Sequence, residues 1–404
     1  MKNLVSLFVS LIVFSTFSFA QSPREGLWKG AIIYSNAEIP FQFEVDYPQP
    51  GTKPVLTFIN GGDRASLEAT VRSDSLVIPM FGFDITLKMK MGEEFMEGTL
   101  FKHYNNRSYP FRGEFGLPRY DIYKEQNPVQ VGERWDMRVN VGMNSEYPAV
   151  GLFEQNGNKV TGTLMTEVSA YRFFEGKVEG NTIELSTFDG VHSFVLKGSY
   201  DERTQQWSGD LILDDGYSRP WKAKRDEEVE LPDPFEFVDL SGRNIKPEWE
   251  KLAGLADQKI NPENYEDKVL IVQIMGMWCS NSQDQTRYLR DWVANNPAKE
   301  VEILAVNYEA NYSPEYGLQR IQTYKERLNV PYRMILGGPL SKTKAAEAFP
   351  FMDEIMAFPT LVFIDKEGYA RYVHRYFTGP ATGEYYREFD RKFNAIVDEL
   401  SSEN

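Results

Sequence analysis

The sequence predicts a multi-domain protein with an all-β N-terminal region and a C-terminal α/β domain built on a mostly parallel sheet. Up to residue 225, short alternating or aromatic-rich runs are separated by turn dipeptides such as Asn156-Gly157 and Asp215-Gly216, a pattern typical of strands. Beyond residue 234, apolar runs alternate with helical patterns, as they do in βαβ units. The length of 404 residues fits two or three domains.

Residues 1–20 have the pattern of a cleavable signal peptide. An early lysine supplies the positive start, Leu4–Phe19 is mostly apolar, and Ser18 and Ala20 place small residues before a cleavage site at Gln21. No later run is long enough for a membrane span. We therefore expect a periplasmic or otherwise exported protein.

The all-β region is predicted at residues 21–225 and contains two related units, residues 24–118 and 130–225. Gly26-Leu-Trp28 in the first unit is echoed by Gly132-Glu-Arg-Trp135 in the second, at an offset of about 110 residues. Three further pairs of segments keep this offset: Val77–Lys88 with Ile183–Lys197, Gly98–Leu100 with Gly209–Leu211, and Tyr109–Arg112 with Arg219–Lys222. We expect a duplicated meander that forms a small barrel or two packed half-barrels, with both tryptophans in the core.

Composition and histidine placement limit the partners. The chain carries 59 acidic against 44 basic residues, a net charge of −15, which disfavours binding to nucleic acid or to an anionic membrane. His103 and His192 have no neighbouring ligands at metal-site spacing, so we interpret them as ordinary strand or loop residues. We predict no metal and no cofactor.

A charged linker at residues 226–234 precedes the C-terminal domain, predicted at residues 235–404. Val269–Met275 is almost uninterruptedly apolar, which is typical of a strand buried on both faces. Ser313-Pro314 has the sequence of a helix cap and first turn. In chain order we expect strand 235–240, helix 247–256, strand 269–275, a helix to residue 295, strand 301–307, helix 313–328, extended segment 333–336, helix 341–349, strands 358–365 and 369–377, and helix 383–400.

Two motifs in this domain carry a family resemblance. The run Gly276-Met-Trp-Cys-Ser-Asn-Ser282 directly follows the first long apolar strand, and Phe358-Pro359-Thr360 opens a later strand that ends at Asp365. In this order, and with matching helices and strands, they resemble the thioredoxin superfamily and, more narrowly, the exported TlpA-like thiol-disulfide oxidoreductases, or redoxins. The resemblance covers residues 235–401 and implies a thioredoxin fold.

Cys279 is the only cysteine of the chain and the expected nucleophile. At the junction of a strand and a helix, unpaired N–H groups and the helix dipole are expected to stabilise its thiolate and lower its pKa. The resemblance implies that Trp278 flanks the thiol. It also implies that Pro359 is cis and that Phe358 and Pro359 form a platform whose backbone pairs with an incoming peptide.

Ser282 stands where the family has its second, resolving cysteine. A hydroxyl cannot release a mixed disulfide, although it could donate a hydrogen bond to the Cys279 thiolate. The predicted site therefore comprises Cys279, Ser282 and Trp278 as catalytic residues, with Phe358 and Pro359 binding the substrate.

The sequence leaves three functions open. In the first, Cys279 acts on protein or small-molecule disulfides, and an external thiol resolves the mixed disulfide. The second is a peroxidase-type activity, which is disfavoured because Val272–Cys279 lacks the Pro-x-x-x-Thr-x-x-Cys pattern of peroxiredoxins. The third is a redox-inactive binding or scaffold protein. His374 lies on a strand from which it could approach Cys279 or face outward, and we assign it no role.

Overall fold

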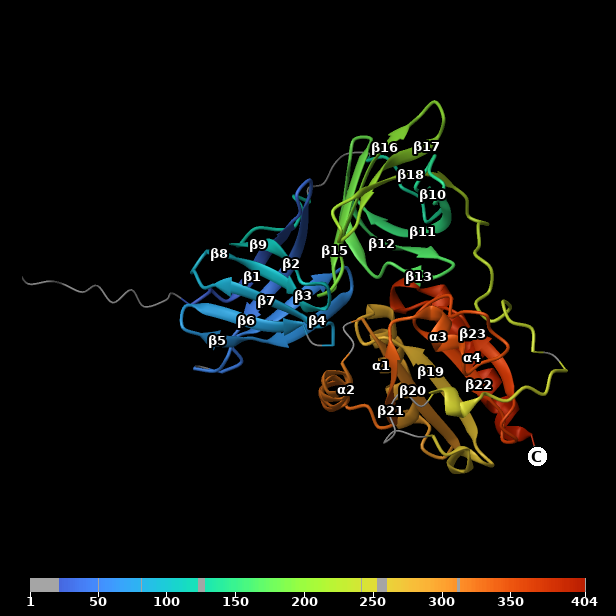
Figure 1. The fold of residues 1–404 in the computed structure, drawn as a ribbon. Helices are drawn as coiled ribbons and strands as arrows, with labels where there is room; N and C mark the ends of the chain where they lie inside the picture. The colour runs from blue at the N-terminus through green and yellow to red at the C-terminus, as the bar shows by residue number, and fades with distance from the viewer. Residues whose placement is uncertain are drawn as a thin grey trace, which may run out of the picture.

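A computed structural model describes residues 22–49, 51–80, 82–122, 128–240, 242–252, 260–310 and 313–403. The predicted signal peptide and its cleavage site lie outside these residues. The described chain forms two β units followed by an α/β domain, and Figure 1 shows the first unit in blue, the second in green and the α/β domain in yellow to red.

The first unit is a nine-stranded antiparallel sheet in the order β4-β3-β2-β1-β9-β8-β7-β6-β5. Its strands are β1 (Gly26–Ile33), β2 (Glu38–Asp46), β3 (Val55–Asn60), β4 (Asp63–Glu68), β5 (Thr70–Arg72), β6 (Ser75–Met80), β7 (Ile85–Lys90), β8 (Phe95–Lys102) and β9 (Arg107–Phe115). Alternate residues of these strands point into one aromatic-rich core, as the period of two requires.

The second unit repeats this construction and closes it into a barrel. Its strands are β10 (Arg134–Val139), β11 (Tyr147–Asn156), β12 (Lys159–Thr166), β13 (Ser169–Ala170), β14 (Phe174–Glu179), β15 (Thr182–Phe188), β16 (Ser193–Asp201), β17 (Gln206–Ile212) and β18 (Ser218–Arg225). Strand β12 pairs with both β11 and β14, so that the meander returns to its own beginning. The all-β, barrel-like prediction is confirmed.

Equivalent tryptophans anchor the two units. The indole N–H of Trp28 donates to the carbonyl of Arg24 over 3.0 Å, and that of Trp135 donates to the carbonyl of Val131 over 2.7 Å. Both side chains are fully buried, each in the core of its own unit. They are core residues, as the sequence predicts, and their matching bonds support the duplication.

The C-terminal domain is a thioredoxin fold with strand order β21-β20-β19-β22-β23. Strands β19 (Val269–Met275), β20 (Val301–Glu309) and β21 (Arg333–Pro339) run parallel, while β22 (Thr360–Ile364) and β23 (Ala370–His374) pair antiparallel. The helices are α1 (Ser280–Asn295), α2 (Pro314–Leu328), α3 (Lys342–Ala346) and α4 (Glu384–Ser402). Every residue of β19 is buried, and neighbouring residues point alternately into two cores, one of which α1, α2 and α4 share.

Two predicted elements of this domain differ in the structure. Residues 235–240 form turns and irregular chain instead of a strand, because Phe235 leaves the linker to pack against Phe363 and Phe389 in the core. The helix predicted from residue 247 is a 3-10 turn at Trp249–Leu252, and residues 253–259 lie outside the described chain.

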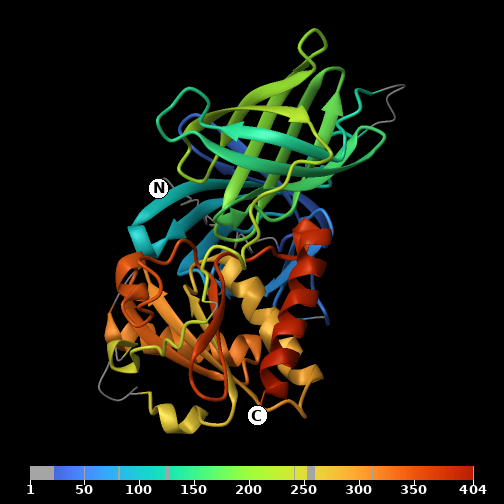
Figure 2. The same ribbon diagram turned by 90° about the vertical axis from the view of Figure 1, so that its right-hand side faces the viewer.

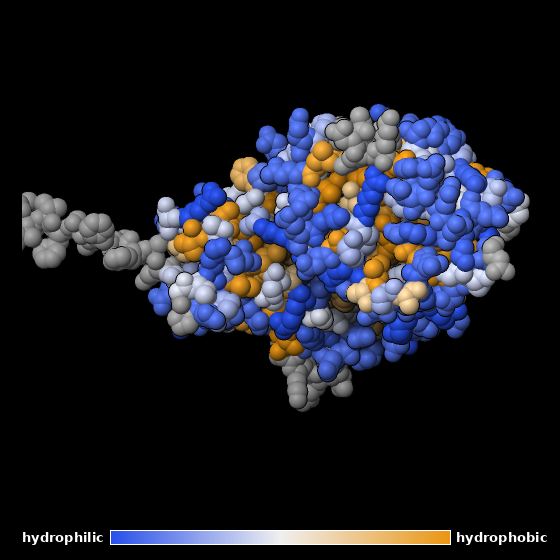
Figure 3. All heavy atoms as spheres, turned by 90° about the horizontal axis from the view of Figure 1, so that it is seen from below, coloured by the Kyte–Doolittle hydropathy of each residue, from blue (hydrophilic) through white to orange (hydrophobic). Residues whose placement is uncertain are grey.

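The barrel of the second unit sits above the thioredoxin fold, and α4 runs along one side of that fold (Figure 2). Figure 3 shows mostly hydrophilic side chains on the face seen from below, with hydrophobic residues interspersed. Within the described ranges, no helix combines the length and the apolar character needed to cross a bilayer.

Candidate functional site: a covered thiol between two domains

Cys279 is the residue on which α1 begins. It follows β19 after a short turn, has extended backbone angles, and acts as the N-cap of the helix. Its Sγ lies 3.3 Å from the carbonyl oxygen of Phe358, to which the thiol donates. The Phe358–Pro359 peptide bond is cis. The structure thus brings together the cysteine and the two residues predicted to face it.

Ser282 and Trp278 also border the sulfur. The Ser282 hydroxyl and backbone N–H and the Asn281 N–H lie in the first turn of α1, where they act to lower the pKa of the Cys279 thiol. The indole N–H of Trp278 donates to the Tyr308 carbonyl over 2.8 Å, which holds the ring edge-on to Phe358 at 5.7 Å between ring centroids. All five predicted site residues therefore lie in one place.

The protonation of Cys279 differs from the sequence-based expectation. The residue is 9% exposed, and this burial raises the pKa of its thiol, while the donor groups of Ser282 and Asn281 lower that pKa by less than burial raises it. The expectation of a lowered pKa is wrong. Burial takes hydration away from the thiolate, and this destabilises the charged form more than the N-terminus of α1 stabilises it. The resting group is a thiol.

The second β unit covers the sulfur. Seven consecutive polar residues at the start of α1, Ser280 to Thr286, are buried. Polar residues at the end of a helix are buried only where another part of the chain packs over them. The Asn281 side-chain amide donates to the Ala170 carbonyl of β13 over 3.2 Å. The Ser280 hydroxyl lies 3.4 Å from Nδ1 of His192, in the turn between β15 and β16.

Arg172 joins three parts of the chain at this interface. Its guanidinium lies 2.6 Å from Asp284 of α1, 2.7 Å from Asp63 of the first unit and 3.9 Å from Asp189 of the second. Burial alone would lower the pKa of Arg172, but the three carboxylates raise it above its ordinary value. Arg172 also has a left-handed backbone with φ of 55°, which non-glycine residues adopt only where contacts hold them.

His192 and Asp189 are site residues that the sequence analysis did not identify. Nδ1 of His192 lies 3.2 Å from Asp189 Oδ2. Burial lowers the pKa of His192, yet the charge and the hydrogen bond of Asp189 outweigh it and raise that pKa above its ordinary value. From the sequence, we interpret His192 as an ordinary strand or loop residue. The position of His192 and Asp189 beside the helix that begins at Cys279 arises only when the barrel docks.

A cavity of about 360 Å³ opens at the sulfur between the two domains. From the barrel it is lined by Val168–Arg172, Asp189, His192, Phe194, Leu213 and Asp214, and from the thioredoxin fold by Trp278–Asn281, Lys342 and Met356–Phe358. Its wall is mostly apolar around a small number of polar groups, as in small-molecule sites.

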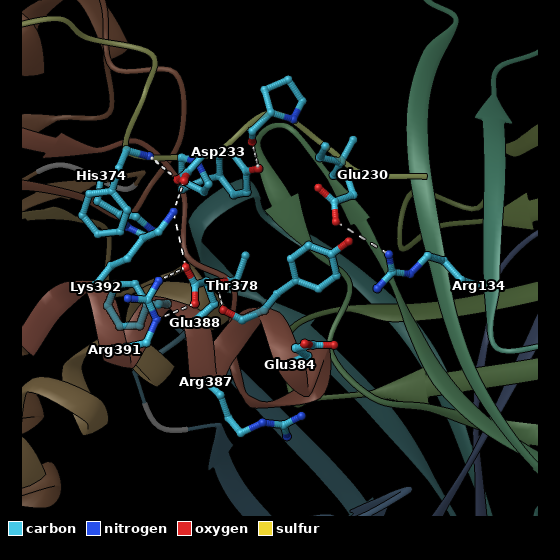
Figure 4. A pocket seen from close by; sticks show the side chains of 17 residues that line it. Arg134, Glu230, Asp233, His374, Thr378, Glu384, Arg387, Glu388, Arg391 and Lys392 are labelled. Atoms are coloured by element: carbon cyan, nitrogen blue, oxygen red, sulfur yellow. Dashed lines mark hydrogen bonds and ion pairs between the residues drawn. The ribbon is translucent and has the colours of Figure 1, made fainter. Parts of the chain in front are cut away.

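A larger cavity, of about 640 Å³, lies between the linker and α4, and Cys279 does not line it. Figure 4 shows Arg134 and Glu230 on one side of this cavity and Asp233, Glu388 and Lys392 on the other. His374 also lines it, buried between aromatic rings, and burial lowers the pKa of His374 to about 3. His374 is therefore neither outward-facing nor beside the thiol.

The described residues contain no group of His, Cys, Asp and Glu side chains arranged to hold a metal ion. The site consists of one sulfur, its hydrogen-bond donors and a cavity with two protein walls.

The chain resembles known proteins over its C-terminal part. A DsbF homologue from Corynebacterium diphtheriae is 16% identical (42% of this chain, 96% of that chain, TM-score 0.28). A secreted thiol-disulfide isomerase from Corynebacterium glutamicum is 17% identical (43% and 98%, TM-score 0.29). A thiol:disulfide interchange protein from Chlorobium tepidum is 16% identical (44% and 100%, TM-score 0.27).

No curated protein matches the chain. The match to a family model is confined to the thioredoxin fold described above, where residues 246–373 fit the AhpC/TSA family. Cys279, Trp278, Ser282, Phe358 and Pro359 all fall within the matched residues. Residues 246–373 of the C-terminal domain are thus similar to the AhpC/TSA, or redoxin, family, and this similarity covers under half of the chain.

Proposed function

We propose that this protein is an exported monothiol oxidoreductase that exchanges disulfides through Cys279. The observation that carries the proposal is the position of Cys279 as the N-cap of α1, with the Ser282 hydroxyl and the N–H groups of Asn281 and Ser282 in the first turn of that helix. These donors stabilise negative charge at the moment when the thiol loses its proton. The predicted signal peptide supports export.

The exchange needs two displacements. The Cys279 thiolate attacks one sulfur of a disulfide, a new S–S bond forms to Cys279, and the other sulfur leaves as a thiolate with the bonding electron pair. An external thiol, once deprotonated, then attacks the substrate sulfur of the mixed disulfide and returns Cys279 to its thiolate form. The external thiol is the electron donor, because Ser282 has no sulfur with which to resolve the bond.

The test is formation of a mixed disulfide in the folded protein. Incubated with a small neutral disulfide, the wild-type chain should gain the mass of one half of the reagent, and Cys279→Ser should gain none. The rate should rise about tenfold per pH unit below the thiol pKa, because only the thiolate attacks. Ser282→Ala should keep the adduct and slow its formation, because one donor to the thiolate is lost.

A second function is favoured by the burial of Cys279. A thiol that is 9% exposed and has a raised pKa also suits a redox-inactive scaffold that holds a partner through its two domains. If the wild-type chain forms an adduct only in denaturant, the scaffold function replaces the oxidoreductase.

A further inference from the structure

We propose that the cavity between the second β unit and the thioredoxin fold is a substrate site for compact, low-molecular-weight disulfides and thiols without net charge, and that it excludes extended polypeptides. This inference rests on the proposed function of Cys279 and specifies its substrate class.

The first argument is that the backbone beside Pro359 is already occupied. The carbonyl of Phe358 accepts from the Cys279 thiol, and that of Ala357 accepts from the Thr360 hydroxyl over 2.8 Å. The segment Val168–Arg172 lines the other side of the same cavity. A peptide that paired with this edge in an extended form would have to displace the segment.

The second argument is that this cover is firmly attached. Two contacts cross the interface: the hydrogen bond from Asn281 to the Ala170 carbonyl and the ion pair of Arg172 with Asp284. A third, the ion pair of Arg172 with Asp63, ties the cover to the first β unit. Removing the cover would separate the buried Arg172 from Asp284 of α1, and breaking a buried ion pair is costly. A compact ligand avoids this cost, because the cavity exists with the cover in place.

The third argument is size and surface. A volume of about 360 Å³ lies at the lower end of the range for small-molecule sites. Phe194 and Leu213 of the barrel face Trp278 and Phe358 of the thioredoxin fold across it. Such a site suits the organic half of a small disulfide and is too small for a folded protein segment.

The fourth argument concerns charge. The charged side chains of the wall that are buried or half-buried already have partners of opposite charge. Asp214 pairs with the buried Lys102 over 2.6 Å, Asp189 pairs with His192, and Arg172 pairs with Asp284, whereas Lys342 is exposed and donates to the Met356 carbonyl. A charged ligand group buried among these pairs would lose its hydration without gaining a free counter-charge there, whereas a neutral group avoids this cost.

The experiment compares three disulfides on the full chain, by the rate at which intact-mass measurements show the Cys279 adduct. The probes are hydroxyethyl disulfide, which is compact and neutral, glutathione disulfide, which is larger and anionic, and a pair of extended peptides joined by a disulfide. We expect the first to react at least tenfold faster than the other two, after correction for their rates with a free model thiol.

A matched pair of variants places the reaction in the cavity. Ser169→Trp fills it from the barrel side and should slow the hydroxyethyl disulfide reaction at least tenfold. Ser208→Trp adds the same side chain to an exposed position of β17, outside the lining, and should leave the rate unchanged.

The outcomes separate the two proposals. If the three probes react equally fast with wild type, or if the two tryptophan variants behave alike, the substrate class is wrong and the monothiol function stands. If no probe reacts until denaturant is added, the proposed function falls, and the substrate class falls with it.

Discussion

The two β units present equivalent turns to the thioredoxin fold, and the two turns do different things. In the first unit, the turn between β6 and β7 places Asp84 against the Tyr316 hydroxyl and the Gly82 carbonyl against Arg320, both on α2. In the second unit, the turn between β15 and β16 places His192 beside Ser280, one residue after Cys279. The repeated architecture explains why both turns dock, and the residues of each turn decide what the docking does.

The sheets also differ in closure. The pairing of β12 with β14 that closes the second unit has no counterpart between β3 and β5 in the described part of the first. Strand β4 extends along the edge of β3 instead, whereas its equivalent β13 has only two residues. The shorter β13 hairpin is free to reach the thioredoxin fold, where Ala170 and Arg172 cover α1. The short β13 thus distinguishes the second unit from the first and places its hairpin in the wall of the cavity at Cys279.

The largest expected effect comes from the two equivalent tryptophans. Trp28→Ala and Trp135→Ala should each lower the free energy of unfolding by about 3–5 kcal/mol, because each leaves a cavity in a core. Trp135 should lie at the upper end, since it stacks on both Trp207 and Trp221. Urea unfolding measures the loss. Only Trp135→Ala should also speed alkylation of Cys279, and equal alkylation in both variants would contradict the assignment of the cover to the second unit.

The next effect compares the two docking contacts. Arg172→Met should cost about 3 kcal/mol, because it strips a buried cation from its carboxylates, and should raise the alkylation rate of Cys279. Tyr316→Phe removes one hydrogen bond of the first unit's turn and should cost about 1 kcal/mol with no change in that rate. Faster alkylation in Tyr316→Phe would show that the two turns are not separable.

A third prediction concerns the pH dependence of stability that the buried His374 gives to the C-terminal domain. Its folded-state pKa of about 3 lies below the ordinary value, so the unfolded chain binds a proton that the folded chain refuses as pH falls below about 6.5. Stability should therefore drop on acidification, by about 2 kcal/mol at pH 5 from this residue alone. His374→Phe should remove that part of the acid sensitivity in urea unfolding at pH 7 and 5. An unchanged difference between the two pH values would contradict the buried, neutral histidine.

The smallest effect concerns His192 and has the opposite sign. Its folded-state pKa is raised by Asp189, so the pair stabilises the fold below the ordinary histidine pKa and loses this contribution as pH rises through the folded-state value. In Asp189→Asn, this loss of stability between pH 5 and 8 should be absent. Urea unfolding of wild type and variant at several pH values in this range measures the difference. An unchanged loss of stability in Asp189→Asn would contradict the raised pKa of His192.

Much of the C-terminal domain could be predicted from local pattern. The apolar run Val269–Met275 is the central strand, Ser313-Pro314 starts α2, and the spacing of Trp278-Cys279 and Phe358-Pro359 identifies the two halves of the site. The strand expected at residues 235–240 was wrong, because Phe235 is held by contacts with α4 and β22 that no local pattern records.

The sequence alone determined the all-β region, the thioredoxin fold, the single cysteine and the serine three residues after it, since each follows from residue type and spacing along the chain. Only the tertiary structure decided that Cys279 is covered and that His192, Asp189 and Arg172 belong to its surroundings. The physical reason is that the pKa of a thiol and the size of its substrate depend on which distant surfaces exclude water from it. Water is excluded only once the domains have docked, and no periodicity or motif in the sequence indicates this docking.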